Sequence, residues 1–416
     1  MRVLLITPYY SPDLGPSAPL FTMLAEGLVK VGHDVVVVTT VPHYPSGQVS
    51  SSYRDDWIHR SVENGVKISR VWVPSVKRSN FAFRLLQFLC YQIGAVWAEF
   101  TQDYDVVLAA NPALWVWMPF AYYVSFSNKP ALFSVHDVYP DVGVTLGVFR
   151  HKFIIEVVAS LERYCLDRSR IVRVLSESFK PGLRNLGTPD SKMALVYDWV
   201  DTDLIRPCPR DNQFAQRHNL KDRFVVLYAG NIGLSQGLEN VLAAAEQLVE
   251  HQDIHFLFVG DGPGREQLMA RAHSNKLTNV QFLPFQARTC LPEVLGSADI
   301  SLVVLRKGIG TGSLPSKTFS ILASGRPIIA SVDEQSETWD LIQKAQAGLC
   351  IEPENPLELV KAILTLKNDQ NLRIRLGQNG RIWAERRHSP QSATMQFEEL
   401  LNKAIGLKEL KRNFSN

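Results

Sequence analysis

The sequence predicts an α/β protein built of two doubly wound, Rossmann-like domains that face each other across a cleft. Three observations support this prediction. The chain has 416 residues, which is too long for one ordinary core and suits two domains of about 200 residues. Short β-branched runs alternate with longer segments of helical period along the whole chain. Most of these runs are continuously apolar, which is typical of parallel strands covered by helices on both faces.

The expected strands follow in chain order. In the first half they are "RVLLIT", "DVVVVTT", "VKISRVWV", "DVVLAA", "ALFSV" and "RIVRVL". In the second half they are "FVVLYAG", "IHFLFVG", "NVQFLP", "DISLVVL" and "RPIIAS". The polar, proline-bearing "VYDWVDTDLIRPCPRDNQF" separates the two sets, so we expect one domain over residues 1–205 and a second over 206–385. The helical period of "SPQSATMQFEELLNKAIG" predicts that residues from about 386 to 416 form a helix that packs back on the first domain.

Composition excludes several classes of protein. A hydrophobic content of 46% with 20% charged residues describes a globular chain, and a net charge of +3 does not favour a nucleic-acid partner. The five cysteines are far apart and form no CxxC pair, which favours reduced thiols in a cytoplasmic enzyme over a disulfide framework or a zinc site: Cys90, Cys165, Cys208, Cys290 and Cys350.

Neither the start of the chain nor its most apolar stretch suggests a signal peptide or a membrane-spanning segment. The start "MRVLLITPYYSPD" has a short apolar run with no cleavage site, so we do not expect a signal peptide. The most apolar stretch, at 112–126, is shorter than the roughly 20 residues that a bilayer span needs.

Ligands of open α/β sheets bind beyond the carboxyl ends of the strands, so the informative residues should follow strands. After the first strand, Gly15 and Ser17 precede a helix and are expected to leave backbone N–H groups for a phosphate or a sugar hydroxyl. An ordinary strand-to-helix turn is the alternative. In "SVHDVYPDVG", His136 and Asp137 are candidates for hydrogen bonds to a sugar or for steadying positive charge on it, whereas capping of the next helix is the preferred role of Asp141.

Two glycine-bearing loops of the second domain are expected to hold a diphosphate. Each of them leads into a helix, and Lys317 supplies a cation at the second one. The first loop, "YAGNIGLSQGLENVLAAAEQL", carries Gly230, Asn231, Gly233 and Gly237, and the second, "GTGSLPSKTFSILASGRP", carries Gly310, Gly312, Pro315 and Ser316.

Two further patterns are set aside. "FVGDGPGREQL" is not a dinucleotide fingerprint, because Arg265 stands where the third glycine belongs. "DTD" at 201–203 resembles a metal-binding Asp-x-Asp, but its place in the interdomain connection favours a solvated turn. No other spacing suggests a metal, so no metal site is expected.

Taken in order along nearly the whole chain, these segments resemble glycosyltransferase family 4 on a GT-B fold. The resemblance rests on "LAEGLVKVGHDVVVVTT", "VLSESFKPGLRNLG", "VDTDLIRP", "YAGNIGLSQGLENVLAAAEQL", "FVGDGPGREQL", "NVQFLPF", "SADISLVVL" and "LPSKTFSILASGRPIIA". "HDVYPD" and the "PSK" loop are most similar to bacterial transferases of the colanic-acid type, which build extracellular polysaccharide.

The resemblance implies a nucleotide-sugar donor bound mainly by the second domain, no catalytic metal or other cofactor, and retention at the anomeric carbon. It places Phe285 by the nucleobase, His136 or Asp137 by the sugar, and Gly15 near the phosphates and acceptor. This chain departs from the family at Asn231 and Gln236, where cations are common, and at Ser320, where a glutamate usually grips the ribose. Lys317 is then the best remaining partner of the diphosphate, with Arg306 and Lys307 as weaker candidates.

The expected site therefore has a catalytic and a donor-binding set. The catalytic set is Asp137, His136 and Lys317. The donor-binding set is Gly15, Gly230, Asn231, Gly233, Phe285, Gly312, Ser313, Leu314, Pro315, Ser316, Lys317 and Ser320.

The expected reaction moves a sugar from a UDP-sugar, with UDP-glucose the first choice, to a glycan or polyprenyl-linked acceptor in exopolysaccharide synthesis. A sugar-nucleotide epimerase on the same fold and a catalytically silent glycan-binding homologue remain the alternatives. An epimerase needs acid and base carboxylates in the cleft, and the sequence offers few.

A basic segment predicts peripheral membrane contact through the first domain, at the inner face of the plasma membrane. Residues 60–84 hold six cations against Glu63, followed by the aromatic "FLCYQIGAVWAEF": Arg60, Lys67, Arg70, Lys77, Arg78 and Arg84. Each such cation contributes about 1 kcal/mol near an anionic surface. A solvated face beside a buried helix explains the pattern equally well.

Overall fold

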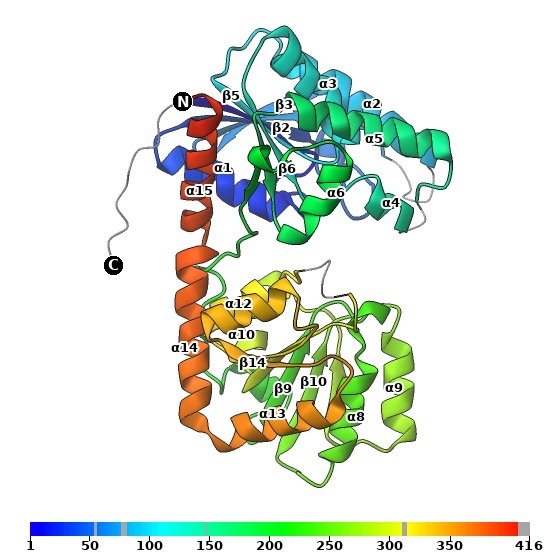
Figure 1. Ribbon diagram of the computed structural model, residues 1–416, viewed down its shortest axis with the longest axis vertical. Coiled ribbons are helices and arrows are strands. Elements are labelled where there is room, and N and C mark those ends of the chain that lie inside the picture. Colours follow the sequence, from blue (N-terminus) through cyan, green and yellow to red (C-terminus); the bar gives the residue numbers. More distant parts are fainter. Residues whose placement is uncertain (54–55, 76–80, 146–147, 310–313, 407–416) are drawn as a thin grey trace. The chain divides into compact units, whose positions relative to one another are not determined.

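The computed structural model describes residues 1–53, 56–75, 81–145, 148–309 and 314–406. The chain divides into two compact units, Met1–Asp198 with the segment that begins at Pro390, and Trp199–Ser389 (Figure 1). The connecting segment belongs to the second unit because its backbone is held there. The amide of Val200 donates to the carbonyl of His388 at 2.9 Å, and the Arg381 guanidinium donates to the carbonyl of Ile205 at 2.8 Å.

Within the described residues, the first unit contains an eight-stranded sheet in the order β3-β4-β2-β1-β5-β6-β7-β8. All neighbours are parallel except β3, which runs antiparallel to β4 at one edge. The strands are β1 (Arg2–Ile6), β2 (Asp34–Thr40), β3 (Ile58–Glu63), β4 (Val66–Val71), β5 (Val106–Ala110), β6 (Ala131–Val135), β7 (Ile171–Val174) and β8 (Met193–Leu195).

Both faces of this sheet are covered, which explains why its central strands are continuously apolar. On β1, Leu4 and Ile6 belong to the cluster formed with α2 and α3, whereas Val3 and Leu5, which alternate with them, are buried on the opposite face. The helices are α1 (Ala18–Lys30), α2 (Phe81–Ala98), α3 (Ala113–Ala121) with a π-helical turn (Tyr122–Phe126), α4 (Asp141–Thr145), α5 (Lys152–Arg168), α6 (Lys180–Asn185) and α15 (Pro390–Ala404).

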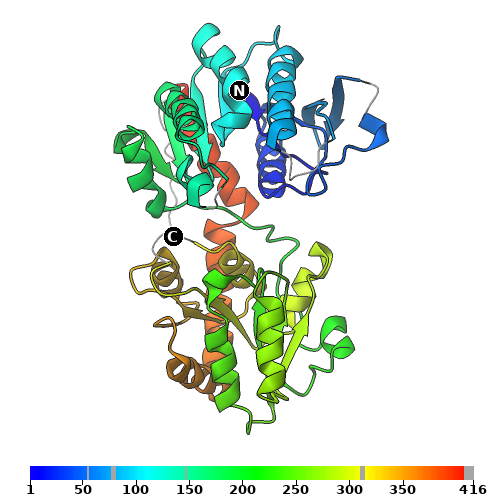
Figure 2. The ribbon, with the colours of Figure 1, turned by 90° about the vertical axis from the view of Figure 1, so that its right-hand side faces the viewer.

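The second unit repeats the plan with a six-stranded parallel sheet, counted over the described part of the chain, in the order β11-β10-β9-β12-β13-β14. Figure 2 shows helices on either side of its strands. The strands are β9 (Phe224–Ala229), β10 (Ile254–Val259), β11 (Val280–Leu283), β12 (Ile300–Val304), β13 (Ile328–Ser331) and β14 (Gly348–Ile351). The helices are α7 (Gln213–Arg217), α8 (Glu239–Gln247), α9 (Arg265–Ser274), α10 (Leu291–Gly296), α11 (Lys317–Ser324), α12 (Glu337–Ala345), α13 (Pro356–Asn368) and α14 (Gln370–Arg387).

The α/β class predicted from the sequence is confirmed, and each expected apolar run contains a strand. The sequence reasoning missed β3 and β14. The β3 sequence "IHRSVE" is largely exposed and polar, as suits an edge strand, so it lacks the apolar signal of the central strands. β14 is a short run, "GLCI", that begins with a glycine.

The segment after Pro390 packs on the first unit through α15. Phe397 and Leu401 are fully buried there, and α15 contacts α1 and β6. The guanidinium of Arg173 lies 5.7 Å from the centre of the Phe397 ring, and Arg170 donates to the carbonyl of Ala404 at 2.8 Å. The last described helix of the chain therefore completes the core of its first sheet.

Candidate functional site

A cavity of about 570 Å³ lies in the second unit, where β9, β10 and β12 end and α11 begins. Its polar lining consists of Asn231, Ser235, Gln236, Gln286, Arg288, Ser316, Lys317 and Ser320. Its apolar lining consists of Ala229, Gly230, Val259, Phe285, Ala287, Leu291, Val294, Leu295, Val304, Leu305, Ile309, Pro315 and Ile321. Among these described lining residues there are two cations and no carboxylate, which makes the cavity suited to an anionic ligand.

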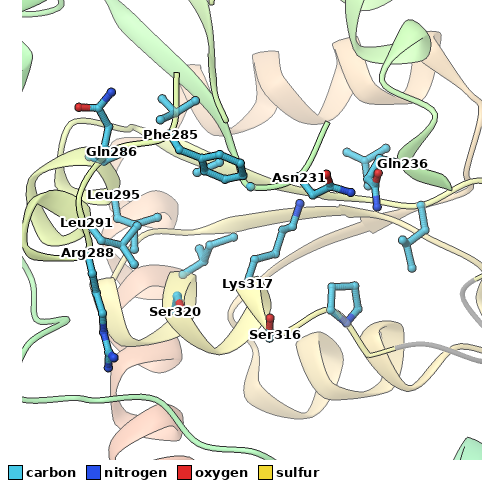
Figure 3. Close-up of a pocket in the computed structure, with 18 of the residues that line it drawn as sticks. Asn231, Gln236, Phe285, Gln286, Arg288, Leu291, Leu295, Ser316, Lys317 and Ser320 are labelled. Carbon is cyan, nitrogen blue, oxygen red and sulfur yellow. The ribbon is translucent and has the colours of Figure 1, made fainter. Parts of the chain in front are cut away.

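Lys317 is the central polar group of this cavity (Figure 3). It is the first residue of α11, and its Nζ donates to the Tyr228 hydroxyl at 2.6 Å and lies 3.8 Å from the centre of the same ring. Burial lowers the pKa of the Lys317 ammonium to about 7. An anion beside this amine would favour its charged form.

Gly230 makes room for this lysine. Its φ of +138° is a conformation that side chains rarely adopt, and a Cβ there would lie 3.1 Å from Nζ and 3.2 Å from Cε of Lys317. The hydroxyl of Tyr228 in turn donates to the carbonyl of Asn231 at 2.6 Å. The glycine loop, the tyrosine and the lysine therefore form one connected arrangement.

The two glycine loops differ in how they meet the cavity. The second reaches it through Ser316 and Lys317 at the start of α11. The first was expected to present a helix N-terminus, which is wrong in detail, because α8 begins only at Glu239 and a 3₁₀ turn (Leu234–Gln236) precedes it. The amide of Gly233 donates to the Gln236 side chain at 2.9 Å, so the turn is closed on itself.

An apolar wall faces the polar end of the cavity. Phe285 follows β11 and has 59% of its surface exposed, which leaves its ring available to a flat ligand. Leu291 and Leu295 of α10 line the cavity near it (Figure 3). A planar, weakly polar group fits between such side chains better than a charged one.

His136 and Asp137 follow β6 in the first unit and are held by Asn111. The amide of His136 donates to Asn111 Oδ1 at 2.8 Å, and Asn111 Nδ2 donates to the carbonyl of Asp137 at 2.5 Å. Burial lowers the pKa of the His136 imidazole to about 4, so this ring is neutral near pH 7. The pKa of Asp137 is raised, first by the loss of surrounding water and then by Asp198, although the residue reaches the surface.

Two family models match the chain in succession. The model described as Glycosyltransferase Family 4 matches residues 20–204, and the model described as Glycosyl transferases group 1 matches residues 209–383. Together they cover the first unit from α1 onward and nearly all of the second. The chain belongs to glycosyltransferase family 4.

Relatives of this family 4 glycosyltransferase include two bacterial proteins named as glycosyltransferases. It is 26% identical over 373 residues to a colanic acid biosynthesis glycosyl transferase of Escherichia coli, WcaI, covering 87% of this chain and 91% of WcaI. It is 23% identical over 224 residues to the alpha-D-kanosaminyltransferase of Streptomyces kanamyceticus, covering 52% of this chain and 56% of that protein.

Solved structures confirm that the fold is GT-B. Sucrose-phosphate synthase from Thermosynechococcus elongatus is similar with a TM-score of 0.71 at 18% identity, over 97% of this chain and 98% of the other. HepE from Anabaena in complex with UDP-glucose is similar with a TM-score of 0.67 at 15% identity, over 97% of this chain and all of that one.

Gly15 of the family 4 glycosyltransferase does not offer the amide that was expected of it. This N–H donates to Asp13 Oδ1 at 2.8 Å, and a Cβ on Gly15 would lie 2.2 Å from the ring of Tyr9. The glycine is therefore explained by close packing. Of the loop residues, Leu314 does not line the described cavity, whereas Gly310, Gly312 and Ser313 lie outside the described residues.

The sequence reasoning missed several residues that the structure places at these sites. Tyr228 lies inside a strand, and nothing in its apolar run distinguishes it from a core residue. Arg288 and Gln286 follow β11 in a polar stretch that could have been noted as a strand end. Asn111 follows β5 before a proline, which is a recognisable turn signal. Arg306, a weaker phosphate candidate, pairs instead with Glu239.

The remaining expectations concern metals and membranes. Within the described residues, no group of three His, Cys, Asp or Glu side chains is placed to hold a metal ion. Asp201 accepts a hydrogen bond from the amide of Leu204 at 2.9 Å, so the "DTD" segment forms a turn. None of the helices that the structure describes combines the length and apolar character needed to cross a membrane.

The basic segment is largely used within the fold. Arg70 is 3% exposed and pairs with Glu63 at 2.9 Å, and Lys67 pairs with Asp34 at 2.8 Å. The exposed Arg60 donates to the carbonyl of Ala98 at 2.8 Å. The expectation that Arg70 faces a lipid surface is therefore wrong. Lys77, Arg78 and the side chain of Arg84 lie outside the described residues.

Proposed function

We propose that this glycosyltransferase uses a UDP-sugar, with UDP-glucose the first candidate, and transfers the sugar with retention to a glycan or polyprenyl-linked acceptor in exopolysaccharide synthesis. The observation that carries the proposal is the partly buried Lys317 in a cavity whose described lining has no carboxylate. A relative named for colanic acid biosynthesis and a structural neighbour in complex with UDP-glucose support the choice of pathway class and donor.

The diphosphate is assigned to the polar end of the cavity. Lys317 lines the cavity together with Asn231, and it lies at the start of α11, where the helix dipole favours an anion. The nucleobase is assigned to the apolar wall of Phe285, Leu291 and Leu295. A cavity of about 570 Å³ is within the range of small-molecule sites.

Bond breaking makes the diphosphate more negative. The bond between the anomeric carbon and the phosphate oxygen breaks, its electrons stay on the diphosphate, and a hydroxyl oxygen of the acceptor bonds to the same face of the carbon. The departing phosphate oxygen takes the hydroxyl proton. Lys317 stabilises the growing charge, so it acts more strongly on the transition state than on the bound donor.

Two alternatives lead to different measurable results. A sugar-nucleotide epimerase needs acid and base carboxylates, and the described lining has none. A silent homologue binds nucleotide without turnover. The test is release of UDP from UDP-glucose with and without an acceptor extract. Release only with acceptor supports transfer, epimer formation without release supports the epimerase, and binding without either product supports the silent homologue.

We also propose peripheral membrane contact. The proposal rests on the exposed side chains of α2 and not on the basic segment 60–84. In the described part of α2, every exposed side chain is large and apolar: Leu85, Leu86, Leu89, Ile93 and Trp97. From Trp97 near the end of α2, a row of stacked pairs runs through Phe100 and Tyr122 to Phe126, and the rings of Trp97, Phe100 and Phe126 are exposed. Aromatic side chains of this kind favour the boundary between lipid and water.

A further inference from the structure

Ser320 occupies the middle of the donor cavity. It lies on α11 three residues after Lys317, so the two side chains share one face of the helix. Figure 3 shows Ser320 between Lys317 on one side and Leu291 and Arg288 on the other. The residue is partly buried and lines the cavity with its hydroxyl group.

The position of Ser320 corresponds to one part of the donor, on the assumption that the proposed function holds. With the diphosphate at Lys317 and the nucleobase at Leu291 and Phe285, the group between them is the pentose. The pentose hydroxyls of a nucleotide are therefore nearest to Ser320, and they need hydrogen-bond acceptors there.

The acceptors available at this point are neutral. No aspartate or glutamate is among the described residues that line the cavity. Its neutral hydroxyl and amide groups belong to Asn231, Ser235, Gln236, Gln286, Ser316 and Ser320. A hydrogen bond between neutral groups changes an affinity by about 2- to 12-fold, whereas one to a carboxylate changes it by about 10- to 100-fold. Removing a pentose hydroxyl from the ligand should therefore cost little here.

We propose that Ser320 makes this donor site tolerant of nucleotides that lack the 2′-hydroxyl, so that sugars activated by a 2′-deoxynucleoside diphosphate fall within its substrate class. Ser320 is the specificity-determining residue, because it is the lining position on α11 that faces the pentose. A carboxylate at this position would restore selection for the ribose.

The test compares UDP with 2′-deoxy-UDP by calorimetric titration at pH 7.5. For the wild type, we expect the two dissociation constants to agree within about 10-fold. Ser320→Glu should weaken both ligands through charge repulsion but raise their ratio by about 10-fold or more. Ser320→Ala should bring the ratio close to one, since the neutral hydrogen bond is lost.

A matched control separates charge from position. Ser316→Glu adds the same charge to the same cavity one residue before Lys317, and should weaken both ligands without changing their ratio. A wild-type ratio of about 50 or more overturns the proposal, and so does an unchanged ratio in folded Ser320→Glu. Failure of the wild type to bind either nucleotide overturns the proposed function itself, which distinguishes the two failures.

Discussion

At the scale of single residues, the proposed function depends on Lys317, whose charged form is disfavoured by burial. Lys317 has a hydroxyl and a ring face of Tyr228 as its neighbours, and burial lowers its pKa to about 7. An anion bound beside Lys317 would favour the protonated form, so the proposed function couples ligand binding to proton uptake. Three predictions belong to this scale.

Lys317→Ala should weaken UDP binding by about 10- to 100-fold, because a hydrogen bond between charged groups is worth roughly 1.5 to 3 kcal/mol. Part of the loss should appear in kcat, since negative charge grows on the diphosphate as the bond breaks. Lys317→Arg should rescue only partly, because the guanidinium is larger and planar. The measurements are UDP titration and donor kinetics. Lys307→Ala, which removes an exposed cation outside the cavity lining, should leave both unchanged. If Lys317→Ala binds UDP and turns over the donor as the wild type does, the assignment of Lys317 to the diphosphate is wrong.

UDP affinity of the wild type should fall by about 10-fold between pH 7 and pH 9. The pKa of Lys317 near 7 means that the free protein loses the ammonium as the pH rises through this range, and the anion prefers the protonated form. The terminal phosphate, with a second pKa of about 6, stays doubly charged throughout. Titrations at each pH provide the measurement. The slope should disappear in Lys317→Arg, which stays charged, and a wild-type affinity that is flat with pH speaks against this role.

Asp137→Asn should lower kcat while UDP affinity stays near the wild-type value. The Asn111 hydrogen bonds fix the backbone on both sides of the peptide that joins His136 and Asp137, so the carboxylate is presented by a rigid segment. Donor kinetics and UDP titration test this together. Asp141→Asn is the matched control, because Asp141 begins α4 and is expected to act only on that helix. An unchanged kcat in Asp137→Asn would return the segment to a purely structural role.

At the scale of single elements, α2 differs from the other helices of its unit in what it shows to solvent. A surface helix normally places charged side chains opposite its buried face, whereas the described residues of α2 carry none there. The buried face of α2, with Phe88 and Tyr91, packs on the sheet. The opposite face of α2 is therefore apolar although packing within the unit does not require it.

Replacing Leu89 and Ile93 together by serine should reduce binding to vesicles that contain anionic lipid, because about 0.8 kcal/mol is lost per buried CH₂ group. Co-sedimentation with the vesicles measures the effect. Leu357→Ser is the control, since Leu357 is an even more exposed leucine, on α13 in the other unit. If the double variant binds vesicles as well as the wild type does, this face of α2 does not bind lipid. If the wild type is a dimer and the double variant is not, the face is a contact between two copies of the chain.

At the scale of the whole molecule, the two units have separate cores. The described cavity around Lys317 is lined by residues of the second unit alone, whereas His136, Asp137 and α2 belong to the first. The chain returns to its first unit through α15, whose Phe397 is fully buried. Loss of that packing should consequently affect one unit and spare the ligand site of the other.

Phe397→Ala should lower the free energy of unfolding of the first unit by about 3 to 5 kcal/mol, through lost burial and the cavity that remains. Hydrogen exchange should become faster in β6 and α1, which contact α15, while UDP affinity is unchanged. Met395→Ala, on the exposed side of the same helix, should change the stability by less than about 0.5 kcal/mol. Unchanged exchange in β6 after Phe397→Ala contradicts this view of α15.

Local signals were sufficient for much of this molecule. Continuous apolar runs predicted the central strands, since a strand covered on both faces needs apolar side chains at every position. Gly230 and Lys317 could also be selected from the sequence. A strand end, a glycine and a helix start can each be recognised within about 20 residues. The edge strand β3 escaped, since exposure on both faces leaves no pattern.

By itself the sequence predicted the α/β class, the central strands and the family, and it selected Lys317 as a candidate, all from residues close together in the chain. The tertiary structure alone decided what surrounds those residues. It brought Tyr228 to Lys317 from 89 positions away, closed the amide of Gly15 on Asp13, paired Arg70 with Glu63 and left the outer face of α2 apolar. The physical reason is that propensity and periodicity act over a few residues, whereas burial, hydrogen bonding and pKa depend on partners that only folding brings together.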